Sequence, residues 1–455
     1  MRAMQSPGKT MNADALLDRL HAVRRQTEAL AAPLSAEDAQ VQSMPDASPT
    51  KWHLAHTTWF FETMVLERFE PGFRPFDANF RMLFNSYYQA VGERHPRPQR
   101  GLLTRPALGE VLAWRAAVDE RLAALCRRGL PDEALGLLEL GLHHEQQHQE
   151  LLLTDALHLL SCSPLRPAYR RAPALAPASM VEPAGGAIDW LPFEGGAVDI
   201  GHDISHAVFA FDNELPRHRC WLASYSLAQR PVTQGEWRQF VDDGAYRDPR
   251  WWLSAGWDWL AAQGLQAPLY WLRDGAGWQV FGLHGPQPLA RARPMVNISF
   301  FEAEAYARWH AAQHPDAPPS RLPTEAEWEH AAASCHSLHG NLLESDALQP
   351  LPAPPAPPAP SAPPAPLVVG LQQMFGDVWE WTRSAYEPYP GFRPWTGAVG
   401  EYNGKFMVDQ LVLRGGSFAT PKSHLRASYR NFFPATARWQ FAGLRLARDA
   451  ARGGR

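Results

Sequence analysis

The stretch Gly141-Leu-His-His-Glu-Gln-Gln-His-Gln-Glu-Leu-Leu-Leu153 places histidines within an apolar helical pattern. Because His144 and His148 are four residues apart, an α-helix projects both imidazoles from one face. Leu137 and Leu151 lie seven residues before and after His144, and such a stripe faces the core of a bundle. Buried imidazoles without partners would each cost roughly 1–3 kcal/mol. The pair therefore either forms hydrogen bonds within a core or binds a metal, and a third ligand would decide between these alternatives.

Four amphipathic segments predict a helix bundle in the first part of the chain. They lie near residues 12–31, 49–69, 107–128 and 132–160. We expect the second helix to begin at Ser48-Pro49 and the third at Pro106, since a cap residue and a proline suit the start of a helix. The connection 70–105 is long for a compact domain and rich in aromatic residues, which favours a functional loop over disorder.

The second part of the chain has a different pattern. After a Pro/Ala-rich hinge near 163–185, short runs bounded by Gly, Pro and Asp predict an irregular α+β domain. Two helices are expected near 299–313 and 324–333, the latter opened by the capping box Thr324-Glu-Ala-Glu327. The segment 350–366 is nearly all Pro and Ala and predicts an exposed insertion. We therefore predict two domains, residues 1–165 and 185–450.

Composition excludes several classes of function. The 43 basic and 47 acidic residues are interleaved and give a net charge of −4, so no basic stripe is available for nucleic acid. Without a signal-like start or a stretch of about 20 apolar residues, we expect a cytoplasmic protein that has no membrane partner. The four cysteines show no CxxC spacing, which indicates neither a cysteine-based zinc site nor a disulfide framework. Nothing in the sequence indicates the oligomeric state.

A third imidazole is available in the second predicted helix, Trp52-His53-Leu-Ala-His56-Thr-Thr-Trp59. His56 shares a helical face with Trp52 and Trp59, whereas His53 lies on a neighbouring face and is expected at the surface or behind a ligand. Spacing alone does not exclude His53 as a ligand. Three imidazoles without thiolate or carboxylate suit zinc, copper or iron. His144-Glu-Gln-Gln-His148 has the HExxH spacing that metalloproteases also use, with the glutamate as general base, so this motif alone does not identify the reaction.

The pairing of Trp52-x-Leu-Ala-His56 with His144-Glu-Gln-Gln-His148-x-Glu150 resembles the bacterial ergothioneine-biosynthesis sulfoxide synthases, whose family includes a selenoneine-synthase branch. The resemblance implies a DinB-like four-helix bundle in which His56, His144 and His148 bind Fe(2+). The later half resembles the formylglycine-generating-enzyme fold, a C-type-lectin-like scaffold. The motifs that carry this second resemblance are Arg230-Pro-Val-Thr-Gln-Gly-Glu236, Arg321-Leu-Pro-Thr-Glu-Ala-Glu-Trp-Glu329, Gly376-Asp-Val-Trp-Glu-Trp381 and Leu413-Arg-Gly-Gly-Ser417.

The resemblance also implies a reaction. Enzymes of this family use iron and O2 to join a sulfur or selenium donor to C2 of the imidazole of hercynine, the betaine of histidine. Gln147 matches the glutamine that holds this imidazole. Asn431 is expected to bind the hercynine carboxylate, and Phe432 or Phe433 to face its trimethylammonium group, which aromatic faces attract.

The long loop carries further candidates. Tyr87-Tyr88 resembles a pair that branches of the family place at the iron as proton or hydrogen donor. Arg94 and Arg97 could bind the carboxylates of a thiol donor, although the neighbouring prolines equally fit a stiff wall. A sugar donor would instead use neutral hydroxyl and amide groups. The donor therefore stays open between a selenosugar and a cysteine-type thiol.

Three alternatives compete with this interpretation. The protein could be a non-catalytic scaffold that holds a small ligand or zinc, or a zinc-dependent thiol transferase of the DinB type. The second domain could itself generate formylglycine, but that chemistry needs a late cysteine pair and no cysteine follows Cys335. Trp328, Trp379 and Trp381 are expected to build the core of that domain.

Overall fold

The structure, a computed structural model, describes residues 13–172, 188–206, 208–275, 277–335, 338–354 and 370–450. The chain forms two compact units. The first comprises Met1–Arg170, Asp203–Asn213 and Phe392–Lys405, and the second comprises Arg171–His202, Glu214–Gly391 and Phe406–Arg455. The units are thus interleaved along the chain, whereas the predicted domains 1–165 and 185–450 follow one another; those bounds stay a prediction. Parts of the predicted hinge and insertion lie outside the described residues.

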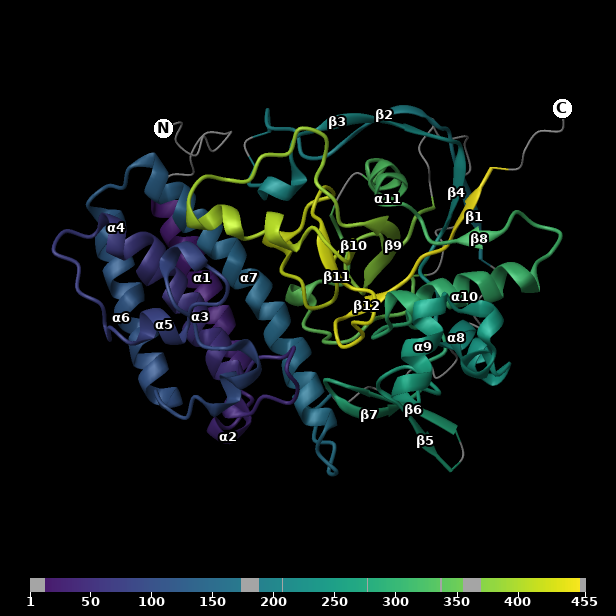
Figure 1. The fold of residues 1–455 in the computed structure, drawn as a ribbon, viewed down its shortest axis with the longest axis horizontal. Coiled ribbons are helices and arrows are strands. Elements are labelled where there is room, and N and C mark those ends of the chain that lie inside the picture. The colour runs from purple at the N-terminus through teal and green to yellow at the C-terminus, as the bar shows by residue number, and fades with distance from the viewer. Residues whose placement is uncertain are drawn as a thin grey trace. The chain divides into compact units, whose positions relative to one another are not determined.

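The first unit is the predicted helical bundle (Figure 1). Its long helices are α1 (Ala13–Ala31), α3 (Thr50–Phe61), α6 (Leu108–Arg127) and α7 (Asp132–Ser161). Helix α1 contacts α6 and α7, and α3 contacts the same two helices. The short α2 (Ala36–Gln40) precedes α3, which continues through a π-helical turn (Glu62–Leu66) into α4 (Glu67–Phe69). None of the helices within the described ranges is long and apolar enough to cross a membrane.

The predicted helix starts were wrong by one or two residues. Helix α3 begins at Thr50, with Pro49 at the cap position, and α6 begins at Leu108. Ser48 does not cap α3, because its backbone N–H donates to Asp155 Oδ2 of α7 at 2.7 Å and its hydroxyl accepts from Arg100. Tertiary hydrogen bonds have therefore replaced the local cap that the sequence predicted.

Helices α3 and α7 approach closely at Gly141. A Cβ atom there would lie 2.4 Å from Cε1 of Phe61 and 3.0 Å from Cε1 of Phe60. Glycine within a helix costs about 1 kcal/mol relative to alanine, so its presence here needs a packing reason. The close approach supplies that reason and sets the spacing of the two helices that carry the three candidate histidines.

The connection 70–105 is ordered. It contains α5 (Phe80–Leu83) and two 3-10 turns, Gln89–Val91 and Arg97–Leu102. The Phe80 and Phe84 rings pack on Trp114 of α6, with centroids 4.8 and 5.6 Å away. Asn85 closes the loop, since its amide accepts from the Tyr88 N–H and donates to the carbonyls of Tyr88, Gly92 and Glu93. The loop is thus a structured wall of the first unit.

Four sheets are formed by the described residues of the second unit. Their strand orders are β1-β4-β13-β8, β11-β10-β9-β12, β2-β3 and β5-β6-β7. The first consists of β1 (Trp190–Phe193), β4 (Tyr225–Ala228), β13 (Ala447–Asp449) and β8 (Ser320–Arg321). The second consists of β11 (Asn431–Pro434), β10 (Gln410–Arg414), β9 (Trp379–Ala385) and β12 (Ala442–Gly443). The smaller sheets are β2 (Gly196–Ile200) with β3 (His218–Leu222), and β5 (Trp271–Asp274), β6 (Gly277–Gly282) and β7 (Gly285–Pro288).

Four helices accompany these sheets: α8 (Gln234–Asp242), α9 (Ser254–Gln263), α10 (Phe300–Gln313) and α11 (Glu325–Ala332). The last two were predicted, including the capping box that opens α11. Helices α8 and α9 were missed, although Thr233 and Glu236 form a capping box at α8 of the same kind. The tryptophans Trp328, Trp379 and Trp381 are buried, as expected for a core.

Candidate metal centre

Three histidines converge inside the first unit. His56 comes from α3, and His144 and His148 come from α7. One nitrogen of each lies within 4.8 Å of the others. All three side chains are buried. The i, i+4 pair on α7 and one residue of the facing helix are therefore sufficient to build a three-imidazole site.

The hydrogen bonds of these rings leave nitrogen lone pairs that could bind a metal. His56 Nδ1 lies 2.7 Å from the Phe84 carbonyl, and since a carbonyl only accepts, this nitrogen carries the proton. His56 Nε2 then has a lone pair, and it is buried without a hydrogen-bond partner. Both nitrogens of His144 are also buried without a hydrogen bond. Buried polar atoms of this kind are costly unless something binds them.

Burial keeps the three rings neutral. It lowers the pKa of His144 to about 3, against the opposing charge of the adjacent Glu145. Burial also lowers the pKa of His56 and of His148 well below the ordinary value, and the charge of a protonated His144 would lower both further. A neutral imidazole with an unpaired nitrogen is the form that binds a metal. The residues present thus fit a metal ion with three nitrogen ligands.

A buried ion-pair network supports α7 beside this site. The Glu145 carboxylate accepts from Arg115 Nη2 at 2.7 Å, Arg24 Nη1 at 2.9 Å and Thr27 Oγ1 at 2.7 Å. Burial alone would raise the pKa of Glu145, but the two arginines outweigh it and lower that pKa to about 2. The network joins α1, α6 and α7 around the residue that follows His144.

Three tyrosines form a connected group of rings, one of which contacts His144. The Tyr87 ring stacks on Tyr88 at 4.6 Å and lies 6.0 Å from the Tyr402 ring. Tyr402 in turn lies 5.8 Å from the His144 ring, and Tyr88 packs on Trp59 at 5.5 Å. Tyr402 was not found from the sequence, because nothing local distinguishes it and it is distant in the chain from the helical motifs.

Two carboxylates hold the segment that carries Tyr402. The Glu401 side chain accepts from the backbone N–H groups of Gln89 at 3.1 Å and Ala90 at 2.9 Å, next to the tyrosine pair. Asp212 accepts from Asn403 Nδ2 at 2.7 Å and from the Trp395 N–H at 3.2 Å. Tyr402 is thus fixed on both sides. The yellow-green turn beside the bundle in Figure 1 belongs to this segment.

The loop arginines differ in their surroundings. Arg94 and Arg97 are exposed and donate to the carbonyls of Ser86 and Asp46. Arg100 is buried, and its guanidinium lies 3.3 Å from the Trp52 ring centroid. It forms no ion pair within the described part of the chain, and burial lowers its pKa. The loop offers Arg81, Arg94, Arg97 and Arg100 as possible carboxylate partners, and Arg100 is the buried one among them.

The predicted hercynine-binding residues fall in both units. Gln147 is half-buried on α7, next to His148. Asn431, Phe432 and Phe433 belong to β11 of the second unit, where Asn431 pairs with Leu413 of β10. The Phe432 ring stacks on Tyr386 at 4.0 Å, and the Phe433 ring meets Trp439 at 5.8 Å. Their roles toward hercynine stay a prediction.

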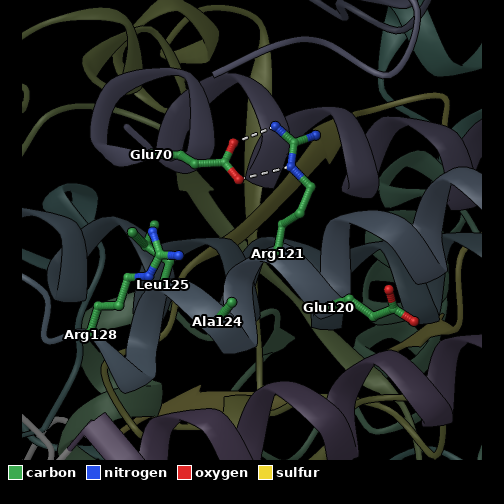
Figure 2. A pocket seen from close by; sticks show the side chains of 6 residues that line it. All are labelled: Glu70, Glu120, Arg121, Ala124, Leu125 and Arg128. Carbon is green, nitrogen blue, oxygen red and sulfur yellow. Dashed lines mark hydrogen bonds and ion pairs between the residues drawn. The ribbon is translucent and has the colours of Figure 1, made fainter. Parts of the chain in front are cut away.

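A separate hollow lies on the surface of α6, and none of the three histidines lines it (Figure 2). Its lining residues are Glu70, Glu120, Arg121, Ala124, Leu125 and Arg128. The central charges already pair, since Arg121 Nε donates to Glu70 Oε1 at 3.0 Å and its Nη2 donates to the second oxygen. The hollow is therefore no rival to the histidine cluster as the reactive site.

Two family models match the chain. The DinB superfamily matches residues 19–152, and the sulfatase-modifying factor enzyme 1-like domain matches 183–350 and 355–450. The hercynine oxygenase of Mycolicibacterium thermoresistibile is 34% identical, over 91% of this chain and 91% of its own. The hercynine oxygenase of Mycolicibacterium smegmatis is 33% identical, over 96% and 99%. That of Mycobacterium tuberculosis is 34% identical, over 91% and 94%.

These matches span both units and agree with the architecture that the sequence motifs predicted. A helical bundle comes first, and a sheet-rich domain of the formylglycine-generating type follows it. The chain therefore belongs to the hercynine oxygenase family.

Proposed function

We propose that this protein is a non-heme iron(II), O2-dependent enzyme that forms a C–S or C–Se bond at C2 of the hercynine imidazole. The observation that carries the proposal is the cluster of three buried, neutral imidazoles in a chain that is 33–34% identical to hercynine oxygenases over nearly its whole length. His56, His144 and His148 would hold the iron. Bound there, iron would supply redox chemistry with O2 at the positions that three protein ligands leave open.

Residues of both units are proposed for the remaining tasks. Gln147, one residue before His148 on α7, would hydrogen-bond the hercynine imidazole. Asn431 and the two phenylalanines after it would bind the betaine end, whose cation suits aromatic faces. Both tyrosine hydroxyl groups are protonated at neutral pH, and because burial raises the pKa of Tyr87 and of Tyr88, each would donate its proton only to a strongly basic group.

Two donor classes fit the proposal. A cysteine-type thiol carries a carboxylate, which would bind Arg100, a buried arginine that hydrogen-bonds two serine hydroxyls and forms no ion pair with the described residues. A selenosugar would need neutral polar groups, yet Asn85 is occupied by backbone groups and the Ser86 hydroxyl accepts from Arg100. A sugar would therefore rely on Gln89 and on stacking against aromatic rings. The resemblance to the selenoneine branch keeps this second class in the proposal.

Metal analysis with oxygen uptake tests the reaction type. We expect one iron per chain and hercynine-dependent O2 consumption once a donor is added. Zinc without O2 uptake would favour a zinc-binding scaffold, and zinc with thiol transfer would favour the DinB-type transferase. Iron with O2 uptake that does not depend on hercynine would also contradict the proposal.

A competition assay identifies the donor. Hercynine, iron(II) and O2 are offered together with cysteine, γ-glutamylcysteine and the 1-thio and 1-seleno sugars, and the products are identified by mass. A cysteinyl sulfoxide as sole product assigns the ergothioneine reaction. A sugar-linked or selenium-bearing product assigns the selenoneine reaction.

The tyrosines give a sharper prediction. Replacing Tyr87 or Tyr402 by phenylalanine should slow product formation by about 10²–10⁴-fold, the usual worth of a positioned proton donor. Oxidation of the donor without C–S or C–Se bond formation should take over. The measurement is the ratio of coupled product to oxidised donor, with iron content and hercynine affinity determined in parallel.

Tyr169→Phe is the matched control, because Tyr169 is a buried tyrosine of the same unit whose hydroxyl donates to the Leu30 carbonyl at 2.6 Å. We expect it to keep most of the coupled product. A double Tyr87→Phe, Tyr402→Phe variant with wild-type product yield would remove both residues from the proposed mechanism.

A further inference from the structure

We propose that His53 and Asp155 act as positioning residues that fix the tautomer and orientation of His148, so that Nε2 of His148 is the atom presented to the metal. The inference rests on the proposed metal centre and adds two residues to it. His53 was expected at the surface or behind a ligand. The structure shows it buried, with 3% of its side chain exposed.

A continuous chain of hydrogen bonds carries the proposal. His148 Nδ1 lies 2.8 Å from His53 Nδ1, and His53 Nε2 lies 3.1 Å from Asp155 Oδ2. The same carboxylate oxygen accepts from the Ser48 backbone N–H at 2.7 Å. His148 and Asp155 lie on α7, His53 lies on α3 and Ser48 just precedes α3, so the chain also ties the two ligand-bearing helices together.

The donors and acceptors of this chain can be assigned in one direction. A carboxylate only accepts, so the proton of a neutral His53 resides on Nε2 and points to Asp155. His53 Nδ1 then has a lone pair and must receive a hydrogen bond. The only hydrogen available between the two rings is the one on His148 Nδ1. His148 consequently carries its proton on Nδ1 and presents the lone pair of Nε2.

His56 reaches the same state by another route, because its Nδ1 proton is fixed by the Phe84 carbonyl. Two of the three ligands are therefore held in the Nδ1–H form by acceptors behind them. Outer partners of this kind orient a ligand ring and make it more basic. If Asp155 could not accept, His53 could reverse and donate from Nδ1. His148 would then carry its proton on Nε2, where it blocks coordination.

Asparagine at position 155 provides the informative comparison. The Ser48 N–H needs an acceptor, so it orients the amide oxygen of Asp155→Asn to the place of Oδ2. That oxygen can also accept from His53, and the tautomer is kept although the charge is lost. Asp155→Leu removes the acceptor at similar volume. If Asp155 selects the tautomer of His148, metal binding should be retained in Asp155→Asn and weakened in Asp155→Leu. If the role of Asp155 is purely ionic, both variants should bind the metal more weakly.

The experiment titrates metal-free protein with Co²⁺ in competition with a chelator and records its visible absorption. We expect Asp155→Leu and His53→Phe to bind Co²⁺ roughly 10–100-fold more weakly than the wild type, and Asp155→Asn within a few-fold of it. Long-range ¹H–¹⁵N spectra of metal-free, ¹⁵N-histidine-labelled protein should show His148 as the Nδ1–H tautomer in the wild type and in Asp155→Asn. Urea unfolding of the metal-free variants controls for stability.

The outcomes separate this inference from the proposed function. Equal Co²⁺ affinity of the wild type and a folded Asp155→Leu would overturn the inference and leave the iron enzyme standing. If Asp155→Leu does not fold, the Co²⁺ affinity of His53→Phe and the His148 tautomer of the wild type test the inference instead. Equal Co²⁺ affinity of the wild type and His53→Phe would overturn it. The inference would also be overturned if His148 of the wild type carried its proton on Nε2. A protein that binds zinc and shows no hercynine-dependent O2 uptake would refute the proposed function, yet the order of the affinities would still test the inference.

Discussion

Replacing His144 by alanine is expected to abolish both metal retention and activity. Its two ring nitrogens are buried and make no hydrogen bond to the described residues, so hydrogen bonding does not explain an imidazole at this place in the core. A bound metal contributes several kcal/mol to a reaction of this kind, which corresponds to a loss of about 10³-fold or more in turnover. The measurement is metal content after gel filtration, followed by turnover with added iron(II). His56→Ala and His148→Ala should behave alike.

His158→Ala is a matched control on the same helix. Its ring hydrogen-bonds Ser43 at 2.7 Å and is not part of the cluster. We expect this variant to keep the metal. His53→Ala should weaken binding without abolishing it, because His53 stands behind His148. The ligand set would be wrong if His53→Ala lost all metal while His56→Ala retained it.

The bundle and two of its candidate ligands could be predicted because their signals are local. Helical periodicity placed the end of α1 and both ends of α7 to within one residue. The spacing of His144 and His148 alone put both rings on the buried face. The third ligand needed a partner helix, and the matched motif around His56 supplied it before any geometry was known. The structure brings the three rings together.

The rest of the site could not be predicted, since it depends on contacts between distant parts of the chain. Tyr402 lies beside His144 because Glu401 binds the N–H of Ala90 in the long loop and Asp212 binds Asn403. Neither carboxylate has a local pattern that reveals its partner. Burial of Arg100 likewise follows from the fold of its loop, which sequence spacing does not encode. By contrast, the missed α8 had a readable signal in its capping box, Thr233 to Glu236.

Glu145→Gln should be among the most destabilising changes in the first unit. The carboxylate accepts from Arg24 and Arg115, and the side chains of all three residues are at most 2% exposed. The substitution keeps the shape of the side chain but leaves buried guanidinium groups without this counter-charge. Breaking a buried ion pair by removing one partner costs about 3–5 kcal/mol. The expected result is a fall of that size in the free energy of unfolding, measured by urea denaturation of the metal-free protein at neutral pH.

A matched surface variant isolates the effect of burial. Glu133→Gln, on the same helix, breaks an ion pair with Arg68 in which both side chains are 47% exposed. Exposed pairs contribute about 0–1 kcal/mol, so this change should be nearly neutral. Equal losses in the two variants would show that the buried network does not stabilise the bundle.

The same network makes the free energy of unfolding depend on pH. The pKa of Glu145 falls from an ordinary 4.5 to about 2 in the folded protein, so the folded state favours the charged form. Its contribution to stability is complete above about pH 4.5 and is lost as the pH falls toward 2, for a total of about 3 kcal/mol. Glu145→Gln should lack this component, and its free energy of unfolding should therefore approach that of the wild type in acid. If the difference between the two proteins were the same at pH 7 and at pH 3, the loss in Glu145→Gln would come from packing or hydrogen bonding, because only the ion pairs require the charge of Glu145.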